Sequence, residues 1–146
     1  MSSQGAVVSK SDVRTTMDEI YAACVGREFE RLATLIDENI DWIIYAPVMV
    51  FPYAGARRGR DAVLEALAAI AEAYVVESYQ REIVVVERDR VAVMADVTFK
   101  QRATGRTLRF RVANFMRFRD GRLIEFREFT NTFDVVEQAL GRELPI

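Results

Sequence analysis

The sequence predicts an α+β fold in which a curved antiparallel sheet wraps around helices from the N-terminal part of the chain. Apolar residues recur with helical spacing in the first half, whereas residues 75–133 read as consecutive strands separated by short turns. Helices grouped early and strands grouped late indicate α+β rather than a parallel sheet. A long, strongly twisted meander of this kind curls into a cone and leaves a cavity against the helices.

The apolar periodicity and the turn residues define the elements in more detail. Pro47 stops a short β-rich run, and the turn-like segment after it is unusually apolar for a loop. This segment either covers a cavity or packs on the sheet edge. The expected elements are helices over 11–25, 28–36, 61–74 and 135–140, a β-run over 40–45, and strands over 75–87, 91–102, 106–119 and 122–133.

The clearest local signal is a hairpin that turns at Asp120-Gly121, because Asp-Gly between alternating apolar runs is typical of a tight β-turn. The turn fixes the register, and the register decides which side chains face inward. On one face it predicts the opposed pairs Val112/Thr130, Asn114/Glu128, Met116/Phe126 and Phe118/Ile124. Asn114 and Glu128 would then be polar groups in an apolar wall, where they either satisfy each other or contact a ligand.

Length and charge limit the function classes. The 146 residues suit one domain, expected over 11–141, with a polar tail at 1–10 and a short tail at 142–146. The formal net charge of −2 at pH 7, without a basic stripe, argues against nucleic acid as a partner. No secretion signal and no apolar run of membrane-spanning length is visible, so we expect a soluble cytoplasmic protein that does not bind membranes.

The chain contains no histidine. This absence removes Ser-His-Asp and Cys-His catalysis and makes a zinc site improbable, so we expect no metal and no cofactor. Acid–base chemistry near neutral pH would have to come from carboxylates with raised pKa values, or from tyrosine or lysine.

Asp96 lies within an otherwise apolar strand, so it faces either water or a cavity. If Asp96 and Glu128 meet inside, two close carboxylates cannot both ionise easily, and one pKa rises to give a neutral acid beside a charged base. The alternative is that both carboxylates pair with arginines on a wet face of the sheet.

The segments 52–63, 113–129 and 133–141 resemble the nuclear transport factor 2-like superfamily, and within it the SnoaL-like and ketosteroid isomerase-like branch. The resemblance implies a cone-shaped α+β barrel, also described as cystatin-like. It further implies an interior cavity that binds a small apolar molecule. The resemblance also implies an activity found in this branch, that of an isomerase, cyclase or hydrolase that uses no cofactor.

Residue by residue, the resemblance to ketosteroid isomerases is partial. Their catalytic base precedes a proline, and here Ala46 occupies that place before Pro47. Asn114 occupies the place of their oxyanion-stabilising acid, and an amide can donate the same hydrogen bond. Tyr21 lies near the place of their donor tyrosine.

Limonene-epoxide-hydrolase-like members instead use two acids bridged by an arginine. Asp96 and Glu128 match the two acids, but Met94 stands where the arginine is expected.

Together these observations predict one site and two functions of different class. The predicted catalytic residues are Asp96, Asn114 and Glu128, and the predicted substrate-binding residues are Tyr21, Trp42, Tyr45, Met116, Phe118, Phe126 and Thr130. The first function is an enzyme acting on a small apolar substrate; the second is a non-catalytic ligand-binding or dimerisation domain of the same fold. A homodimer is expected in either case, because Phe115 and Val97 are assigned to the outer sheet face among charges.

Overall fold

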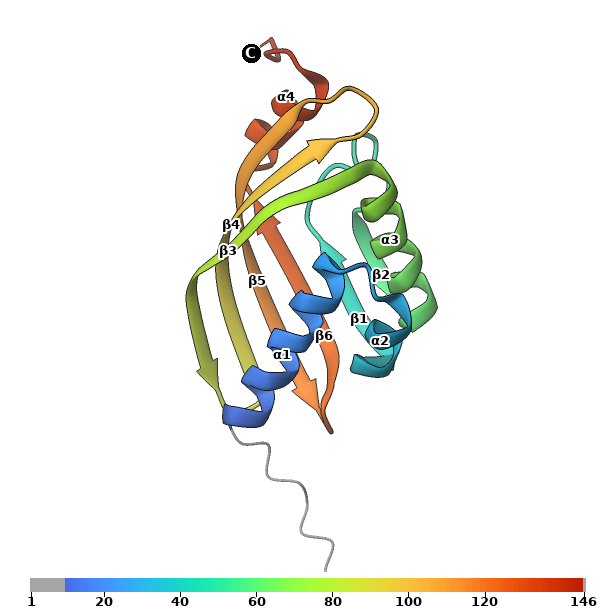
Figure 1. The fold of residues 1–146 in the computed structure, drawn as a ribbon, viewed down its shortest axis with the longest axis vertical. Coiled ribbons are helices and arrows are strands. Elements are labelled where there is room, and N and C mark those ends of the chain that lie inside the picture. The colour runs from blue at the N-terminus through green and yellow to red at the C-terminus, as the bar shows by residue number, and fades with distance from the viewer. Residues whose placement is uncertain (1–9, 146) are drawn as a thin grey trace, which may run out of the picture.

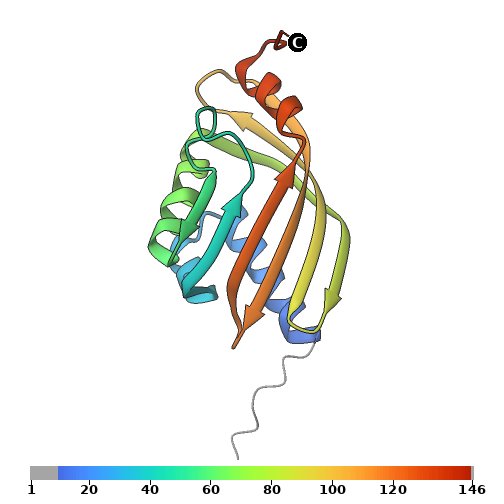
Figure 2. The ribbon, with the colours of Figure 1, turned by 180° about the vertical axis from the view of Figure 1, so that it is seen from behind.

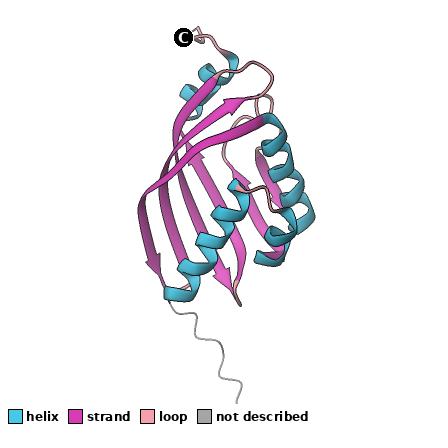
Figure 3. Ribbon diagram, viewed as in Figure 1, coloured by secondary structure: helices cyan, strands magenta, loops and turns pink. Residues whose placement is uncertain are grey.

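The computed structural model describes residues 10–145 of the chain (Figures 1 and 3). The predicted tail at 1–10 therefore lies outside the described residues, except for Lys10, which already belongs to the first helix. The helices are α1 (Lys10–Val25), α2 (Phe29–Leu35), α3 (Arg60–Ala73) and α4 (Thr132–Leu140); the strands are β1 (Ile36–Ile44), β2 (Gly55–Arg58), β3 (Tyr74–Glu87), β4 (Arg90–Gln101), β5 (Thr107–Arg119) and β6 (Arg122–Thr130).

The predicted α+β class is confirmed, with one six-stranded sheet in the order β2-β1-β6-β5-β4-β3. The four late strands form the expected antiparallel meander. The sheet as a whole is mixed, however, because β1 pairs with β6 in parallel. A parallel pair needs a long connection, and here α3 and four strands (β2, β3, β4 and β5) supply it. The short strand β2, within the apolar segment after Pro47, is an element that the sequence pattern did not predict.

The sheet is strongly curved, and α1, α2 and α3 cover its inner face (Figure 1). Seen from behind, the outer face of the sheet carries none of the helices of residues 10–145, and α4 lies at one end of the strands (Figure 2). Strand alternation fits this arrangement: on β4, Val91, Val93, Ala95 and Val97 are buried, and the residues between them are more exposed. The core therefore lies between the inner sheet face and the three helices.

The structure confirms the part of the hairpin prediction that concerns the turn and the pairs near Asn114 and Glu128. Asp120 and Gly121 both have positive φ, 52° and 72°, as a tight hairpin turn of the primed type requires. Asn114 lies opposite Glu128, and Met116 lies opposite Phe126. The predicted pair Phe118/Ile124 is wrong, because a bulge between Arg117 and Phe118 shifts the register and places Phe118 opposite Leu123.

The segment after α4 is not a free tail over its described part. The backbone N–H of Leu144 donates to Oε2 of Glu137 over 2.7 Å, and the Leu144 side chain packs against the core. Within residues 10–145, no helix is long and apolar enough to cross a membrane.

Candidate functional site

A cavity of about 260 Å³ lies between the helices and the inner face of the sheet. It is close to the lower end of the range of about 300–1,000 Å³ that is usual for small-molecule sites. Most of its lining is aliphatic or aromatic, including Leu32, Ile36, Ile44, Phe51, Leu67 and Val112. The volume and lining suit a small, mainly apolar molecule.

One polar network, centred on a buried side chain, interrupts this apolar wall. The side-chain oxygen of Asn114 accepts hydrogen bonds from the hydroxyls of Tyr21, at 2.7 Å, and Tyr79, at 3.1 Å. The amide nitrogen of Asn114 donates to Oε1 of Glu128 over 3.0 Å. The four side chains come from α1, β3, β5 and β6, and all of them line the cavity. Asn114 is the centre of the network and is only 1% exposed.

Burial alters the acid–base properties of these groups. Desolvation raises the pKa of the Glu128 carboxyl above its ordinary value, and the hydrogen bond from Asn114 opposes part of that rise. Desolvation also raises the pKa values of Tyr21 and Tyr79, so both hydroxyls keep their protons and act as donors at neutral pH. The Cys24 thiol lines the same cavity, and burial raises its pKa to about 12, so it stays uncharged.

This arrangement can hold and release one proton inside an apolar space. Oε1 of Glu128 accepts from Asn114, while Oε2 has no hydrogen bond to any side chain or backbone group of residues 10–145. A carboxyl with a raised pKa can serve as a general acid or a general base near neutral pH. The network therefore gives Glu128 the properties that the sequence analysis required of a carboxylate catalyst.

Aromatic stacking forms another part of the wall. The rings of Trp42 and Phe126 stack with centroids 4.0 Å apart and planes 17° apart. Nε1 of Trp42 is buried and has no hydrogen-bond partner within the described part of the chain. Trp42 therefore contributes its ring face to the wall, and its N–H is not part of the Asn114 network.

The structure brings seven of the ten predicted site residues to the cavity. They are Tyr21, Trp42, Asn114, Met116, Phe126, Glu128 and Thr130. Thr130 uses its hydroxyl to donate to the backbone oxygen of Arg111 over 2.7 Å. Ala46, in the place where the resemblance puts the isomerase base, also lines the cavity.

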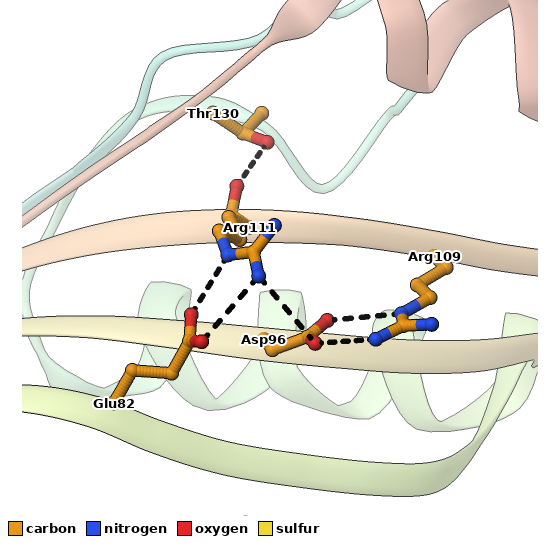
Figure 4. Close-up of polar contacts among 5 residues, drawn as sticks. All are labelled: Glu82, Asp96, Arg109, Arg111 and Thr130. Carbon is orange, nitrogen blue, oxygen red and sulfur yellow. Dashed lines mark hydrogen bonds and ion pairs between the residues drawn. The ribbon is translucent and has the colours of Figure 1, made fainter.

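The placement of Asp96 in the site is wrong. Asp96 lies on the outer face, where its carboxylate pairs with Arg109 at 2.8 Å and with Arg111 at 3.9 Å (Figure 4). Arg111 in turn pairs with Glu82 at 2.7 Å. The reason is strand parity: with Ala95 and Val97 buried, the residue between them must point outward. Asp96 and Glu128 therefore form no acid pair.

Two of the predicted lining residues also lie elsewhere. Phe118 is 1% exposed and belongs to the packed core, beyond the bulge that interrupts the hairpin, and it does not reach the cavity. Tyr45 is 42% exposed and stacks on Phe129, with ring centroids 4.4 Å apart. Tyr45 follows the inward-facing Ile44, so alternation turns it to the other side of the sheet.

Tyr79 is the functional side chain that the sequence analysis missed. It lies in β3, where bulges between Val76 and Ser78 and between Arg81 and Ile83 break the alternation. Its partner across the ladder is the buried Val97. Pairing with an inward-facing residue explains why Tyr79 faces the cavity, but this pairing is not visible in the local sequence pattern.

Comparison with known proteins agrees with this architecture. The SnoaL-like domain family matches residues 17–126. The crystal structure of a proposed isomerase from Rhodopseudomonas palustris is 41% identical and covers 87% of this chain and 97% of that one, with a TM-score of 0.84. An NTF2-like protein from Burkholderia xenovorans is 24% identical, with coverages of 90% and 98% and a TM-score of 0.80. A search of curated proteins found no match.

More distant structures share the fold. An LEH-like epoxide hydrolase from M. tuberculosis is 11% identical, covering 90% of this chain and 91% of that one, with a TM-score of 0.73. The curved sheet, the three covering helices and the cavity between them define a protein of the NTF2-like, ketosteroid isomerase-like fold. Within that class, the chain belongs to the SnoaL-like domain family.

Proposed function

We propose that this protein catalyses proton transfer on a small apolar carbonyl compound, as an isomerase does, with Glu128 as the acid–base group. The observation that carries the proposal is the half-buried Glu128 carboxyl, which has a raised pKa and accepts a hydrogen bond from Asn114 inside an apolar cavity. A relative at 41% identity is itself a proposed isomerase, which supports the same class of reaction.

In the proposed reaction, Oε2 of the Glu128 carboxylate removes a proton from a carbon next to the carbonyl group. The C–H bond breaks, an O–H bond forms on Glu128, and the electron pair moves onto the carbonyl oxygen as an enolate. Asn114 uses one N–H for Glu128, and its second N–H is the available donor for the enolate oxygen. Glu128 then returns the proton to another carbon of the conjugated system, which completes an isomerisation.

Solvent deuterium exchange tests this step without knowledge of the natural substrate. The probe is 2-tetralone, a small bicyclic ketone, and NMR follows deuterium incorporation next to its carbonyl. The wild type is expected to accelerate the exchange, and Glu128→Gln is expected to lower the acceleration by at least about 100-fold, the usual contribution of a positioned acid–base group. Glu125→Gln, on the same strand but outside the cavity lining, is the matched control. Wild-type exchange in Glu128→Gln would refute the proposal.

A second candidate is a non-catalytic ligand-binding domain. The observation that favours it is Ala46, which lines the cavity where ketosteroid isomerases carry their base. In this case 2-tetralone raises the melting temperature of the protein, but the exchange rate stays at the background rate. Hydrolysis through an acid pair is not proposed, since Asp96 lies on the outer face.

A homodimer remains a prediction, now on altered grounds. Val97 does not belong to the outer face, because it is 1% exposed and lines the cavity. Phe115 and Phe129 do lie exposed, with ring centroids 6.0 Å apart, and Tyr45 stacks on Phe129. We propose that a second copy covers these rings. Light scattering should give twice the chain mass for the wild type and the monomer mass for Phe115→Lys; a wild-type monomer at micromolar concentration would contradict the prediction.

A further inference from the structure

We infer that the ligand of this cavity, apolar over most of its body, also carries one negative group such as a carboxylate, which lies at the cavity rim beside Arg27 and Arg102. The inference rests on the proposed function, since it concerns the same cavity and names the class of molecule that enters it. It adds a recognition element at the rim, separate from the acid–base group in the interior.

The rim can be located from exposure. Most lining residues are buried or half-buried, but Val25, Arg27, Val75 and Arg102 are exposed. They come from the end of α1, the turn between α1 and α2, the start of β3 and the turn between β4 and β5. Where lining residues are exposed, the cavity meets solvent, so these four residues mark the way in.

The charges of the lining are unevenly distributed. Glu128 is the only acidic lining residue among residues 10–145, and it lies in the interior next to Asn114. The two cationic lining residues, Arg27 and Arg102, lie at the rim. Neither forms an ion pair with an acidic side chain in the described chain. A ligand entering here therefore passes two uncompensated guanidinium groups, which attract a negative charge.

Arg27 occupies a backbone conformation that is unfavourable for arginine. Its φ is +57°, in the left-handed region, although the adjacent Gly26 could adopt that region without strain. Its backbone N–H donates to the oxygen of Cys24 over 3.2 Å, which holds the turn at the end of α1. Arg27 is thus fixed at the rim by its backbone while its side chain remains exposed.

Arg102 is positioned by different contacts. Its Nε donates to the backbone oxygen of Ala71 over 3.2 Å, and its backbone N–H donates to the oxygen of Ala73 over 2.9 Å. Both carbonyls belong to the last turn of α3. The Nε edge of the guanidinium is therefore anchored, and its two terminal nitrogens remain available as donors. A pre-anchored guanidinium loses less side-chain entropy when it binds a carboxylate.

Trp42 supplies a direct reporter for the test. It is the single tryptophan of the chain, and it lines the cavity. Binding is measured by the change in Trp42 fluorescence when the full-length protein is titrated with 4-phenylbutanoate or with 4-phenylbutanol. The two probes share an apolar body and differ in charge. At low salt the wild type is expected to bind the acid at least about fivefold more tightly than the alcohol, as for a partly exposed ion pair.

Replacing the rim charges isolates their effect. The double variant Arg27→Gln/Arg102→Gln is expected to bind the acid only as tightly as the alcohol, with its affinity for the alcohol unchanged. The matched control is Arg119→Gln/Arg122→Gln at the β5–β6 turn, which also removes two exposed arginines but none from the cavity lining. This control should keep the wild-type preference for the acid. The single variants Arg27→Gln and Arg102→Gln then show how much of that preference each arginine contributes.

The outcomes separate this inference from the proposed function. If the wild type binds acid and alcohol equally, the rim does not recognise an anion, while the cavity and Glu128 chemistry stand. If the rim variant weakens both probes equally, the arginines support the structure and do not select charge, and the inference is overturned. If neither probe changes Trp42 fluorescence at millimolar concentration, the cavity does not bind such molecules and the inference is overturned, whereas the exchange of 2-tetralone still decides the proposed proton transfer.

Discussion

Nδ2 of Asn114 donates to Oε1 of Glu128 over 3.0 Å, directly across the β5–β6 ladder. Two tyrosine hydroxyls occupy the oxygen of the same amide, so the amide is held with its nitrogen toward Glu128. Oε1 of Glu128 must then act as an acceptor, and the proton of the neutral acid belongs on Oε2. The Asn114 network thus selects which carboxyl oxygen can exchange a proton with a ligand.

Asn114→Ala should therefore be strongly destabilising. It removes three partly buried hydrogen bonds and leaves the hydroxyls of Tyr21 and Tyr79 without their acceptor. We expect a loss of about 2–4 kcal/mol in the free energy of unfolding, measured by urea denaturation. Asn39→Ala, at an exposed position, is the control and should change it by less than about 0.5 kcal/mol. Equal effects of the two substitutions would contradict the role of the network.

The raised pKa of Glu128 makes stability depend on pH in a defined direction. The folded protein keeps the Glu128 proton above the ordinary pKa of 4.5, whereas the unfolded chain releases it. Between the pKa of Glu128 in the unfolded chain and its higher pKa in the folded protein, the folded state binds more protons. The free energy of unfolding therefore falls as pH rises through this window. Glu128→Gln is neutral throughout and should melt several degrees above the wild type at pH 8 but not at pH 4. A difference that is the same at both pH values would exclude this linkage.

Much of the fold was predictable because it depends on short-range patterns. Asp120-Gly121 fixed the hairpin, and the hairpin placed Asn114 opposite Glu128. The parallel pairing of β1 with β6 was not predictable in the same way, since it joins segments far apart in the chain. Local periodicity contains no information about which distant strand becomes a neighbour.

The errors at the site have local physical causes. Bulges shifted Phe118 relative to its partner strand and hid the inward direction of Tyr79, and a bulge leaves no clear mark in alternating apolar residues. Asp96 is a different case: the apolar residues on either side left both water and a cavity open, and the structure pairs it with Arg109 on the outer face. The family resemblance placed Asp96 in an acid pair, and the burial of Ala95 and Val97 in the structure excludes that placement.

Asp96→Asn should accordingly leave the proton-transfer activity unchanged. Arg109 holds the pKa of the Asp96 carboxyl below its usual range, which is the behaviour of a surface ion pair rather than a catalytic acid. We expect deuterium exchange of 2-tetralone within about twofold of the wild type, and a small loss of melting temperature that high salt removes by screening. A large loss of exchange in Asp96→Asn, with the fold intact by circular dichroism, would restore Asp96 as a catalytic residue.

The C-terminal end of α4 offers a test of packing apart from the site. Gly141 has a φ of +69°, and a Cβ added there would lie 2.3 Å from Cζ of Arg106. The Arg106 side chain donates to the backbone oxygen of Ala139 over 3.2 Å, so moving it away also removes a hydrogen bond. Gly141→Ala should therefore cost both backbone strain of about 1–2 kcal/mol and the displacement of Arg106.

Gly105→Ala separates these two costs. Gly105 has a similar φ of +74°, but nothing lies within 4 Å of an added Cβ. It should show only the backbone strain, so urea denaturation should find Gly141→Ala more destabilising than Gly105→Ala by about 0.5–1.5 kcal/mol, the usual contribution of the one hydrogen bond that Arg106 loses. The double variant Arg106→Ala/Gly141→Ala lacks the clash. Its loss in the free energy of unfolding should therefore be smaller than the sum of the losses in the two single variants. Simple additivity would mean that Arg106 does not restrict residue 141.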